Sequence, residues 1–277
     1  MDHTDAELDA PLRVGAVSYL NTAPLVRALP ELAPSIVLSF DHPSRLADLL
    51  ADGRLDVALA PSIELARHPE WSIISTACIG CRGPVLSVKA LFRNPPEEVE
   101  SLALDEGSRT SVALAQMLLF DAYGVRPRLE VLPLGASPSD SQADAVLVIG
   151  DRAIAPTPPE FCEAWDLGER WLRATGLPFV FAVWAARPGV ELGALEAALD
   201  AARDRGVAEL EAIAAERAAA LGLARPAVLE YLREHLNFYF DAGERRGLGL
   251  FLRRAAELEL IPHDFRWQFD DSAAEHR

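Results

Sequence analysis

The sequence predicts an α/β fold of two lobes that face one cleft, and three features of the chain indicate it. Apolar strand patterns alternate with helical patterns over residues 12–87, and a second set of strands and helices follows over residues 102–150. Two long apolar runs, 85–92 and 175–184, lie before and after that second set. Alternating strands and helices are typical of parallel sheets covered by helices. The two apolar runs therefore predict that the chain crosses between the lobes once in each direction.

The first lobe is predicted to begin with a buried strand, because Leu12, Val14, Ala16 and Val17 form an apolar strand pattern. Pro24 then marks a helix, since the missing N–H of proline has no helical partner in the first turn. The same patterns recur along the first 80 residues. The predicted strands span residues 12–18, 36–41, 57–61 and 73–78, and the predicted helices span 24–29, 43–51 and 62–67.

The second lobe is predicted from the units that follow Pro95 and Pro96. Its strands span 102–105, 129–134 and 145–150, and its helices span 109–123 and 171–174. After Pro188 the chain is almost wholly helical, with helices over 191–221, after Pro226, and over 244–258. These last helices have no strand partners of their own, so we expect them to pack on the first lobe.

This organisation predicts a discontinuous first domain and a continuous second one. The first domain comprises residues 12–90 plus 182–277, the second comprises 91–181, and residues 1–11 form a flexible N-terminus. Two α/β lobes joined by two crossover strands are the architecture of type II periplasmic-binding-protein folds. We therefore expect a periplasmic-binding-protein type II-like fold whose ligand lies between the lobes.

Composition and charge narrow the classes of partner. The chain has 277 residues, 50% of them hydrophobic and 25% charged, so it can bury a substantial core. Its net charge of −16 repels a phosphate backbone, and no basic patch offsets it, so we expect no nucleic-acid partner. The start lacks the regions of a secretory signal, and no stretch is apolar for long enough to span a bilayer. We expect a cytoplasmic protein without a membrane partner.

Neither a metal ion nor a cofactor is expected from the motifs. Cys78 and Cys81 have the spacing of half a zinc site, but no second Cys or His pair completes it. The histidines show no metal-ligand spacing, and the chain lacks a Ser/His/Asp arrangement and a phosphate-loop glycine pattern.

The turn after the first strand is the first candidate for a binding site. Tyr19, Asn21 and Thr22 lie between that strand and the helix that Pro24 opens, with Asn21 or Thr22 as the N-cap. A helix N-terminus offers free amides and a partial positive charge, which suit a carboxylate or a phosphate. The alternative is a well-capped helix without a ligand.

A second polar turn follows the strand 102–105. Ser108, Thr110 and Ser111 lead into the helix 109–123, with Arg109 among them. Hydroxyl groups and helix N-terminal amides together favour an anion or hydroxyl pocket, and an N-cap cluster without a ligand is the alternative.

Three further polar residues follow other strands or lie on the crossover runs. Ser62 and Ser87 are candidates to reach the cleft, and Asp151 either holds a substrate hydroxyl or caps the turn after it. The aromatic residues Trp71, Phe179, Phe181 and Trp184 line the cleft or fill the core, and the core is favoured for all four.

Six stretches spread over most of residues 12–187 carry a resemblance to a known family. They are VGAVSYLNTAPL (14–25), DVALAPS (56–62), SV (87–88), LDEGSRTS (104–111), IGD (149–151) and TGLPFVFAVW (175–184). In these stretches the chain resembles the menaquinone-biosynthesis family of the futalosine pathway. The resemblance extends over a whole fold, whereas the C-terminal helices add little to it.

The resemblance implies that chorismate, a small dicarboxylate, loses water to give 3-[(1-carboxyvinyl)oxy]benzoate. It implies a role for Asn21 in catalysis, with Ser87 and the turn of Ser108, Thr110 and Ser111 holding the substrate. The matched motifs contain no evident catalytic base, so the enolpyruvyl carboxylate of the substrate is our candidate proton acceptor. Two alternatives stay open: the related enzyme that makes 1,4-dihydroxy-6-naphthoate, and a small-carboxylate-binding module without catalysis.

Overall fold

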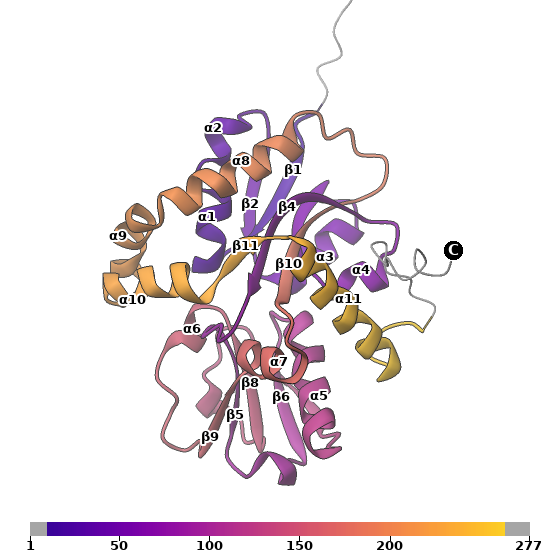
Figure 1. Cartoon of the computed structure of the whole chain (residues 1–277), viewed down its shortest axis with the longest axis vertical. Helices are drawn as coiled ribbons and strands as arrows, with labels where there is room; N and C mark the ends of the chain where they lie inside the picture. Colours follow the sequence, from indigo (N-terminus) through magenta and orange to yellow (C-terminus); the bar gives the residue numbers. More distant parts are fainter. Residues whose placement is uncertain (1–9, 264–277) are drawn as a thin grey trace, which may run out of the picture.

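A computed structural model of the chain describes residues 10–263, which form two β-sheets with helices packed around them (Figure 1). The first sheet has six strands in the order β11-β4-β10-β3-β1-β2. These strands are β1 (Arg13–Val17), β2 (Val37–Asp41), β3 (Val57–Pro61), β4 (Ser72–Cys81), β10 (Phe179–Ala186) and β11 (Asn237–Tyr239). β1 pairs in parallel with β2 and β3, whereas β10 runs antiparallel between β3 and β4.

The second sheet has five strands in the order β7-β6-β8-β5-β9. They are β5 (Val88–Phe92), β6 (Ser101–Asp105), β7 (Arg128–Leu132), β8 (Ala145–Ile149) and β9 (Glu163–Asp166). β6 is parallel to β7 and β8, and β5 is antiparallel to β8 and β9. Parallel β1, β3, β6 and β8 all end where the two sheets approach each other, which positions the residues that follow them near one place.

The chain passes between the sheets twice, as the apolar runs predicted. Residues 82–87 lead from β4 of the first sheet to β5 of the second. Residues 176–178 lead back, from helix α7 (Leu167–Thr175) to β10 of the first sheet. The predicted two-lobed α/β fold with two crossovers is confirmed. The predicted domain limits at residues 90 and 182 stay a prediction, and residues 1–9 of the predicted flexible N-terminus lie outside the described residues.

The helices between strands are mostly short. They are η1 (Leu20–Thr22), α1 (Ala23–Val26), α2 (Leu29–Leu32), α3 (Pro43–Ala51), α4 (Glu64–Arg67), η2 (Pro96–Glu98), α5 (Thr110–Tyr123), η3 (Pro138–Asp140) and α6 (Asp151–Ile154). The single helix predicted over 24–29 is wrong, because the chain forms α1 and then α2. Pro30 lies in the first turn of α2, where its lack of an N–H costs no hydrogen bond.

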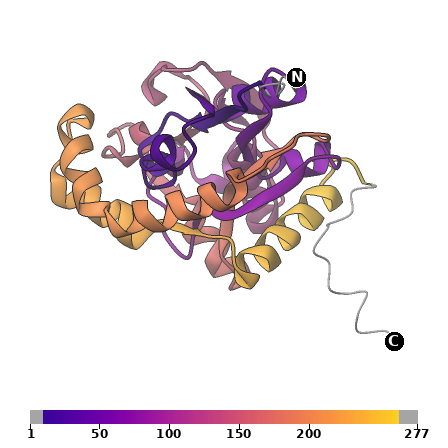
Figure 2. The ribbon, with the colours of Figure 1, turned by 90° about the horizontal axis from the view of Figure 1, so that it is seen from above.

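The C-terminal part forms α8 (Leu195–Ala208), α9 (Leu210–Leu221), α10 (Arg225–Glu230), the π-helix η4 (Tyr231–His235), β11 and α11 (Ala242–Glu257). α8 packs on β4 and α11 packs on β10, so both cover one face of the first sheet (Figure 2). The prediction that these helices pack on the first lobe is confirmed. α11 also contacts α5 of the second sheet, and Arg254 of α11 pairs with Asp121 of α5.

Two sequence expectations for the C-terminal part need correction. The helix predicted over 191–221 is interrupted at Glu209, where α8 ends and α9 begins. α8 lies so close to α1 that a Cβ on Gly206 would come within 1.8 Å of the Pro24 carbonyl oxygen. The break brings Glu209 next to Arg27, whose Nε donates to Glu209 Oε2 at 2.8 Å. Strand β11 was not predicted, because three residues between helices carry no detectable strand pattern.

One large hydrophobic core includes buried residues from both sheets and from the C-terminal helices. A smaller cluster of buried residues lies around β8 of the second sheet. No helix in residues 10–263 is both long and apolar enough to cross a membrane.

Candidate functional site

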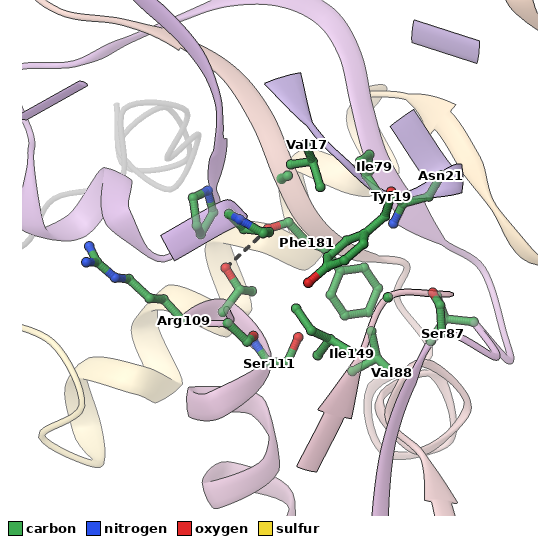
Figure 3. A pocket seen from close by; sticks show the side chains of 17 residues that line it. Val17, Tyr19, Asn21, Ile79, Ser87, Val88, Arg109, Ser111, Ile149 and Phe181 are labelled. Atoms are coloured by element: carbon green, nitrogen blue, oxygen red, sulfur yellow. Dashed lines mark hydrogen bonds between the residues drawn. The ribbon is translucent and has the colours of Figure 1, made fainter. Parts of the chain in front are cut away.

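A pocket lies between the two sheets, at the ends of β1, β3, β6 and β8 (Figure 3). Its empty volume is about 500 Å³, a figure that includes space open to solvent. Both sheets contribute to it. The lining residues are Val17, Tyr19, Asn21, Pro43, Pro61, Ile79, Val85, Ser87, Val88, Ser108, Arg109, Thr110, Ser111, Ile149, Gly150, Phe181 and Ala182.

The pocket combines apolar walls with neutral hydrogen-bonding groups. Val17, Ile79, Ile149 and Phe181 supply apolar surface, and the polar lining consists of hydroxyl groups, one amide and Arg109. Among the described residues, the lining includes no carboxylate, imidazole, thiol or amine side chain. A pocket of this kind suits an apolar ring that carries groups able to accept hydrogen bonds.

Asn21 lies in η1, directly after β1, and its side chain lines the pocket. Thr22 Oγ1 donates to Asn21 Oδ1 at 3.4 Å, which directs the Asn21 NH₂ group away from Thr22. Thr22 itself is buried and does not line the pocket. Thr22 is thus a neighbour that orients Asn21 rather than a contact for a ligand.

The η1 turn is held by a carboxylate from the other sheet. Leu20 N donates to Asp151 Oδ1 at 3.0 Å, and Asp151 belongs to α6, which follows β8. Burial raises the pKa of Asp151, and the hydrogen bond from Leu20 opposes this shift. Asp151 is not part of the lining. Asp151 accepts the hydrogen bond of the Leu20 amide, which the sequence analysis had counted among the free amides for a ligand. The same bond links the Asn21 turn to α6, which follows β8 of the second sheet.

Tyr19 reaches from the first sheet onto glycine backbone of the second. A Cβ on Gly150, whose φ is +73°, would lie 2.7 Å from Tyr19 Cε1, and a Cβ on Gly107 would lie 3.3 Å from the Tyr19 hydroxyl. The hydroxyl also lies 3.1 Å from His42 Nδ1. Burial and then nearby Asp105 raise the pKa of Tyr19 well above its usual value, so its hydroxyl stays protonated.

Ser87 lies on the first crossing, immediately before β5, and it is only 1% exposed. Leu86 before it has φ of +60°, a left-handed conformation that costs a residue with a Cβ about 1–2 kcal/mol. The Asp166 carboxylate holds this conformation, because it accepts hydrogen bonds from Val85 N at 2.9 Å and from Leu86 N at 2.7 Å. The strained backbone fixes the Ser87 hydroxyl at the pocket wall.

The turn before α5 supplies the polar groups of the second sheet. Ser108 Oγ accepts from Ser111 N at 3.3 Å, which caps the helix, and both side chains line the pocket. Thr110 Oγ1 forms hydrogen bonds across the cleft, since it donates to Phe181 O at 3.1 Å and accepts from Ile63 N at 3.3 Å. The N-terminus of the 14-residue helix α5 therefore borders the pocket with its partial positive charge.

Arg109 is the cation of the lining, but carboxylates of helices α3 and α4 already pair with it. Its guanidinium lies 2.5 Å from Asp48 and 3.1 Å from Glu64, whose side chain is buried. In Figure 3 the Arg109 side chain extends away from the Ser87 side of the pocket. Arg109 thus joins the two sheets and adds little net positive charge to the pocket.

Comparison with known proteins assigns this chain to a family. A family model described as menaquinone biosynthesis matches residues 12–257. The chain belongs to this menaquinone biosynthesis family.

Members with assigned names share much of the sequence. The chain is 33% identical to a chorismate dehydratase of Thermus thermophilus over 259 residues, which cover 87% of this chain and 94% of that relative. It is 30% identical to a chorismate dehydratase of Campylobacter jejuni over 174 residues, 61% of this chain and 64% of that relative.

Solved structures agree on the fold of the family member described here. Protein AF1704 from Archaeoglobus fulgidus matches with a TM-score of 0.71 at 15% identity, covering 92% of this chain and 100% of that one. The periplasmic aliphatic sulphonate binding protein SsuA from Escherichia coli matches with a TM-score of 0.58 at 16% identity, covering 93% and 97%. At such identities these likenesses show the periplasmic-binding-protein-like fold alone.

Most of the residues predicted for the site in this family member come together in the pocket. Tyr19, Asn21, Ser87, Ser108, Arg109, Thr110 and Ser111 line it. Thr22, Ser62 and Asp151 do not line it. Ser62 Oγ donates to Val180 O at 2.7 Å, so this buried hydroxyl joins β3 to β10 instead. The roles of all ten residues toward a substrate stay predictions.

Sequence reasoning missed the apolar part of the lining. Phe181 was assigned to the core, yet its ring lines the pocket, whereas Trp71, Phe179 and Trp184 are buried in the core as expected. These apolar lining residues could have been predicted from their positions at strand ends, because Val17, Ile149 and Phe181 all belong to or adjoin strands that end at the cleft. Gly150 was also missed, although its place after an apolar strand indicated a close approach of another group.

Proposed function

We propose that the chain catalyses the loss of water from chorismate to give 3-[(1-carboxyvinyl)oxy]benzoate. The observation that carries this proposal is the 33% identity to the Thermus thermophilus chorismate dehydratase, which extends over 94% of that relative. This similarity extends over 87% of the present chain, so it is not confined to one motif. The reaction is a carbon–oxygen elimination, so the chain acts as a hydro-lyase.

The composition of the pocket supports a substrate of this kind. Chorismate has a six-membered ring with two carboxylates, and the pocket offers apolar walls together with donors on opposite sides. Asn21 lies in η1, which follows β1 of the first sheet, whereas Ser108 and Ser111 lie at the N-terminus of α5, which follows β6 of the second. Donors in both lobes fix the ring between them and hold it in one orientation.

The proton acceptor in our proposal is the substrate itself. The described lining residues include no carboxylate or imidazole, and the raised pKa of Tyr19 keeps its phenol protonated and unable to accept a proton. The C–H bond beside the hydroxyl-bearing carbon breaks, and the proton goes to the enolpyruvyl carboxylate. The electron pair completes the aromatic ring as the C–O bond breaks, and the departing hydroxide takes up that proton to leave as water.

Asn21 is the protein group we assign to this step. Because Thr22 engages Asn21 Oδ1, the NH₂ group is available to donate to negative charge that develops on the substrate. Loss of a single donor of this kind typically lowers kcat by about a hundredfold or more. We therefore expect Asn21→Ala to lower kcat by about a hundredfold while the protein still folds.

The test is incubation of the purified protein with chorismate, followed by ultraviolet absorbance and mass spectrometry. A new aromatic product lighter than chorismate by one water supports the proposal. Binding without loss of water instead favours a carboxylate-binding module, and an absence of binding favours the naphthoate-forming relative or another small acid. A kcat of Asn21→Ala equal to that of the unsubstituted protein contradicts the role of Asn21.

A further inference from the structure

Two buried hydroxyl groups beside the pocket have no hydrogen-bond partner within residues 10–263. They are Ser87 Oγ and the hydroxyl of Tyr231, and each residue is only 1% exposed. A buried hydroxyl without a partner destabilises the folded protein, so two of them beside one pocket call for an explanation. Ser87 lines the pocket, whereas Tyr231 is not one of the lining residues.

Tyr231 comes from the part of the chain that the family motifs did not include. It begins the π-helix η4, and helical turns of this kind occur frequently at functional sites. η4 is attached to the first crossing, because His235 Nδ1 lies 2.9 Å from Pro84 O. The strand after η4, β11, pairs with β4, whose end leads into the same crossing. The C-terminal segment thus places Tyr231 against the residues that precede β5.

The protonation of the two groups sets the direction of any hydrogen bond between them. Burial raises the pKa of Tyr231 well above its usual value, and the Ser87 hydroxyl is close enough to oppose that shift. Tyr231 therefore keeps its proton and has one to donate. Ser87 Oγ can accept a hydrogen bond from the Tyr231 hydroxyl and donate another through its own proton. The backbone position of Ser87 is fixed by the left-handed Leu86 and by Asp166.

We propose that Tyr231 is a positioning residue, whose hydroxyl donates to Ser87 Oγ and so directs the Ser87 hydroxyl proton at a substrate carboxylate. The inference rests on the proposed function, because it takes the ligand of the pocket to be a carboxylate. Hydroxyl groups linked in a chain polarise one another, which strengthens the final donor. An anion at Ser87 completes the chain and gives both buried hydroxyls a partner.

The first test compares Tyr231→Phe, Ser87→Ala and the double variant in steady-state kinetics with chorismate. We expect Tyr231→Phe to raise KM about fivefold with kcat within twofold, and Ser87→Ala to raise KM about tenfold or more. Because Tyr231 acts through Ser87, the double variant should match Ser87→Ala. A KM of Tyr231→Phe equal to that of the unsubstituted protein, or effects that multiply in the double variant, overturn the proposal.

Thermal unfolding of the ligand-free protein separates positioning from a structural role. In the ligand-free protein the Tyr231 hydroxyl has no hydrogen-bond partner within residues 10–263, so the Tm of Tyr231→Phe should be unchanged or higher although its KM is worse. A lower Tm that accompanies the weaker KM indicates a structural role and contradicts the proposal. Tyr239→Phe is the matched control, because Tyr239 lies in the same segment but its hydroxyl is not one of the buried groups without a partner in residues 10–263, and both parameters should stay unchanged.

Two further measurements keep the proposal testable. If Tyr231→Phe does not fold, 3-fluorotyrosine at position 231 retains the ring and strengthens the donor. KM should then fall, and an unchanged or higher KM contradicts the proposal.

Calorimetry uses 3-hydroxybenzoate and 2-phenoxyacrylate, which carry one carboxylate each. It should show that Tyr231→Phe weakens the binding of only one of these ligands. Equal weakening of the binding of both ligands, or weakening of neither, overturns the proposal. If the unsubstituted protein does not convert chorismate, the proposed function fails independently of these comparisons.

Discussion

The bond between Asp151 and the Leu20 amide offers a sharp test of how the second sheet controls the Asn21 turn. Asp151 lies in α6 and Leu20 begins η1, so the bond of 3.0 Å joins the two sheets next to Asn21. We predict that Asp151→Ala impairs catalysis although Asp151 does not line the pocket. The variant removes the acceptor of the Leu20 amide and frees the turn that presents Asn21.

The expected magnitude follows from the type of hydrogen bond. A hydrogen bond to a charged group contributes about 1.5–3 kcal/mol, and about 1.4 kcal/mol corresponds to a tenfold change in rate. If the whole of this energy positions Asn21, kcat/KM of Asp151→Ala falls by about 10- to 150-fold. Asp151→Asn keeps an acceptor oxygen but loses the charge, so its kcat/KM should fall by about fivefold.

The assay is steady-state conversion of chorismate, with Asp140→Ala as the matched control. Asp140 in η3 also accepts a backbone N–H, that of Ser137 at 2.8 Å, but this bond is local and lies outside the pocket lining. Asp140→Ala should therefore change kcat/KM by less than twofold. The reasoning is refuted if Asp151→Ala keeps kcat/KM within twofold of the unsubstituted protein, or if it loses no more activity than Asp140→Ala.

Two further predictions concern backbone space and charge. Gly150→Ala should lower stability by about 2–4 kcal/mol and reduce activity, because its Cβ would meet the Tyr19 ring at 2.7 Å and its φ is +73°. Gly124→Ala is the control, because Gly124 has φ of +71° but open space around it, and it should lower stability by only about 1–2 kcal/mol. Stability is measured by urea titration of both variants, and equal losses refute the contact between Gly150 and Tyr19. Asp56→Asn should destabilise the protein near neutral pH, because hydrogen bonds from Arg13 hold the pKa of Asp56 far below its usual value. This stabilisation is present above the usual Asp pKa of about 4 and is lost as pH falls toward the depressed value, so the difference between variant and unsubstituted protein should shrink in acid. A difference independent of pH argues against this ion pair.

The parts of the site that could be predicted are those encoded by local sequence. An apolar strand followed by a polar residue and a proline specifies a strand end and a helix start without reference to the rest of the chain. Asn21 and the turn of Ser108 and Ser111 were found in this way, and both line one pocket. The strand ends of a parallel sheet meet at one edge, so the common location of the turns followed from the fold.

The parts that could not be predicted depend on contacts between distant segments. The sequence identified Arg109 as a candidate anion contact, but its ion pairs with Asp48 and Glu64 exist only because the sheets face each other. In the same way, Tyr231 lies next to Ser87 because the C-terminal segment returns to the first sheet, where β11 pairs with β4. No helical or strand pattern around Tyr231 indicates which of the two sheets it will approach.

The paired state of Arg109 also bears on the proposed proton acceptor. An unpaired guanidinium beside the enolpyruvyl carboxylate would lower the pKa of that carboxylate by direct attraction and make it a weaker base. Asp48 and Glu64 neutralise Arg109, and the other polar lining groups are neutral donors. The pocket thus offers a substrate carboxylate dipoles rather than an unpaired cation, which is compatible with the proposed substrate-assisted elimination and with a chain whose net charge is −16.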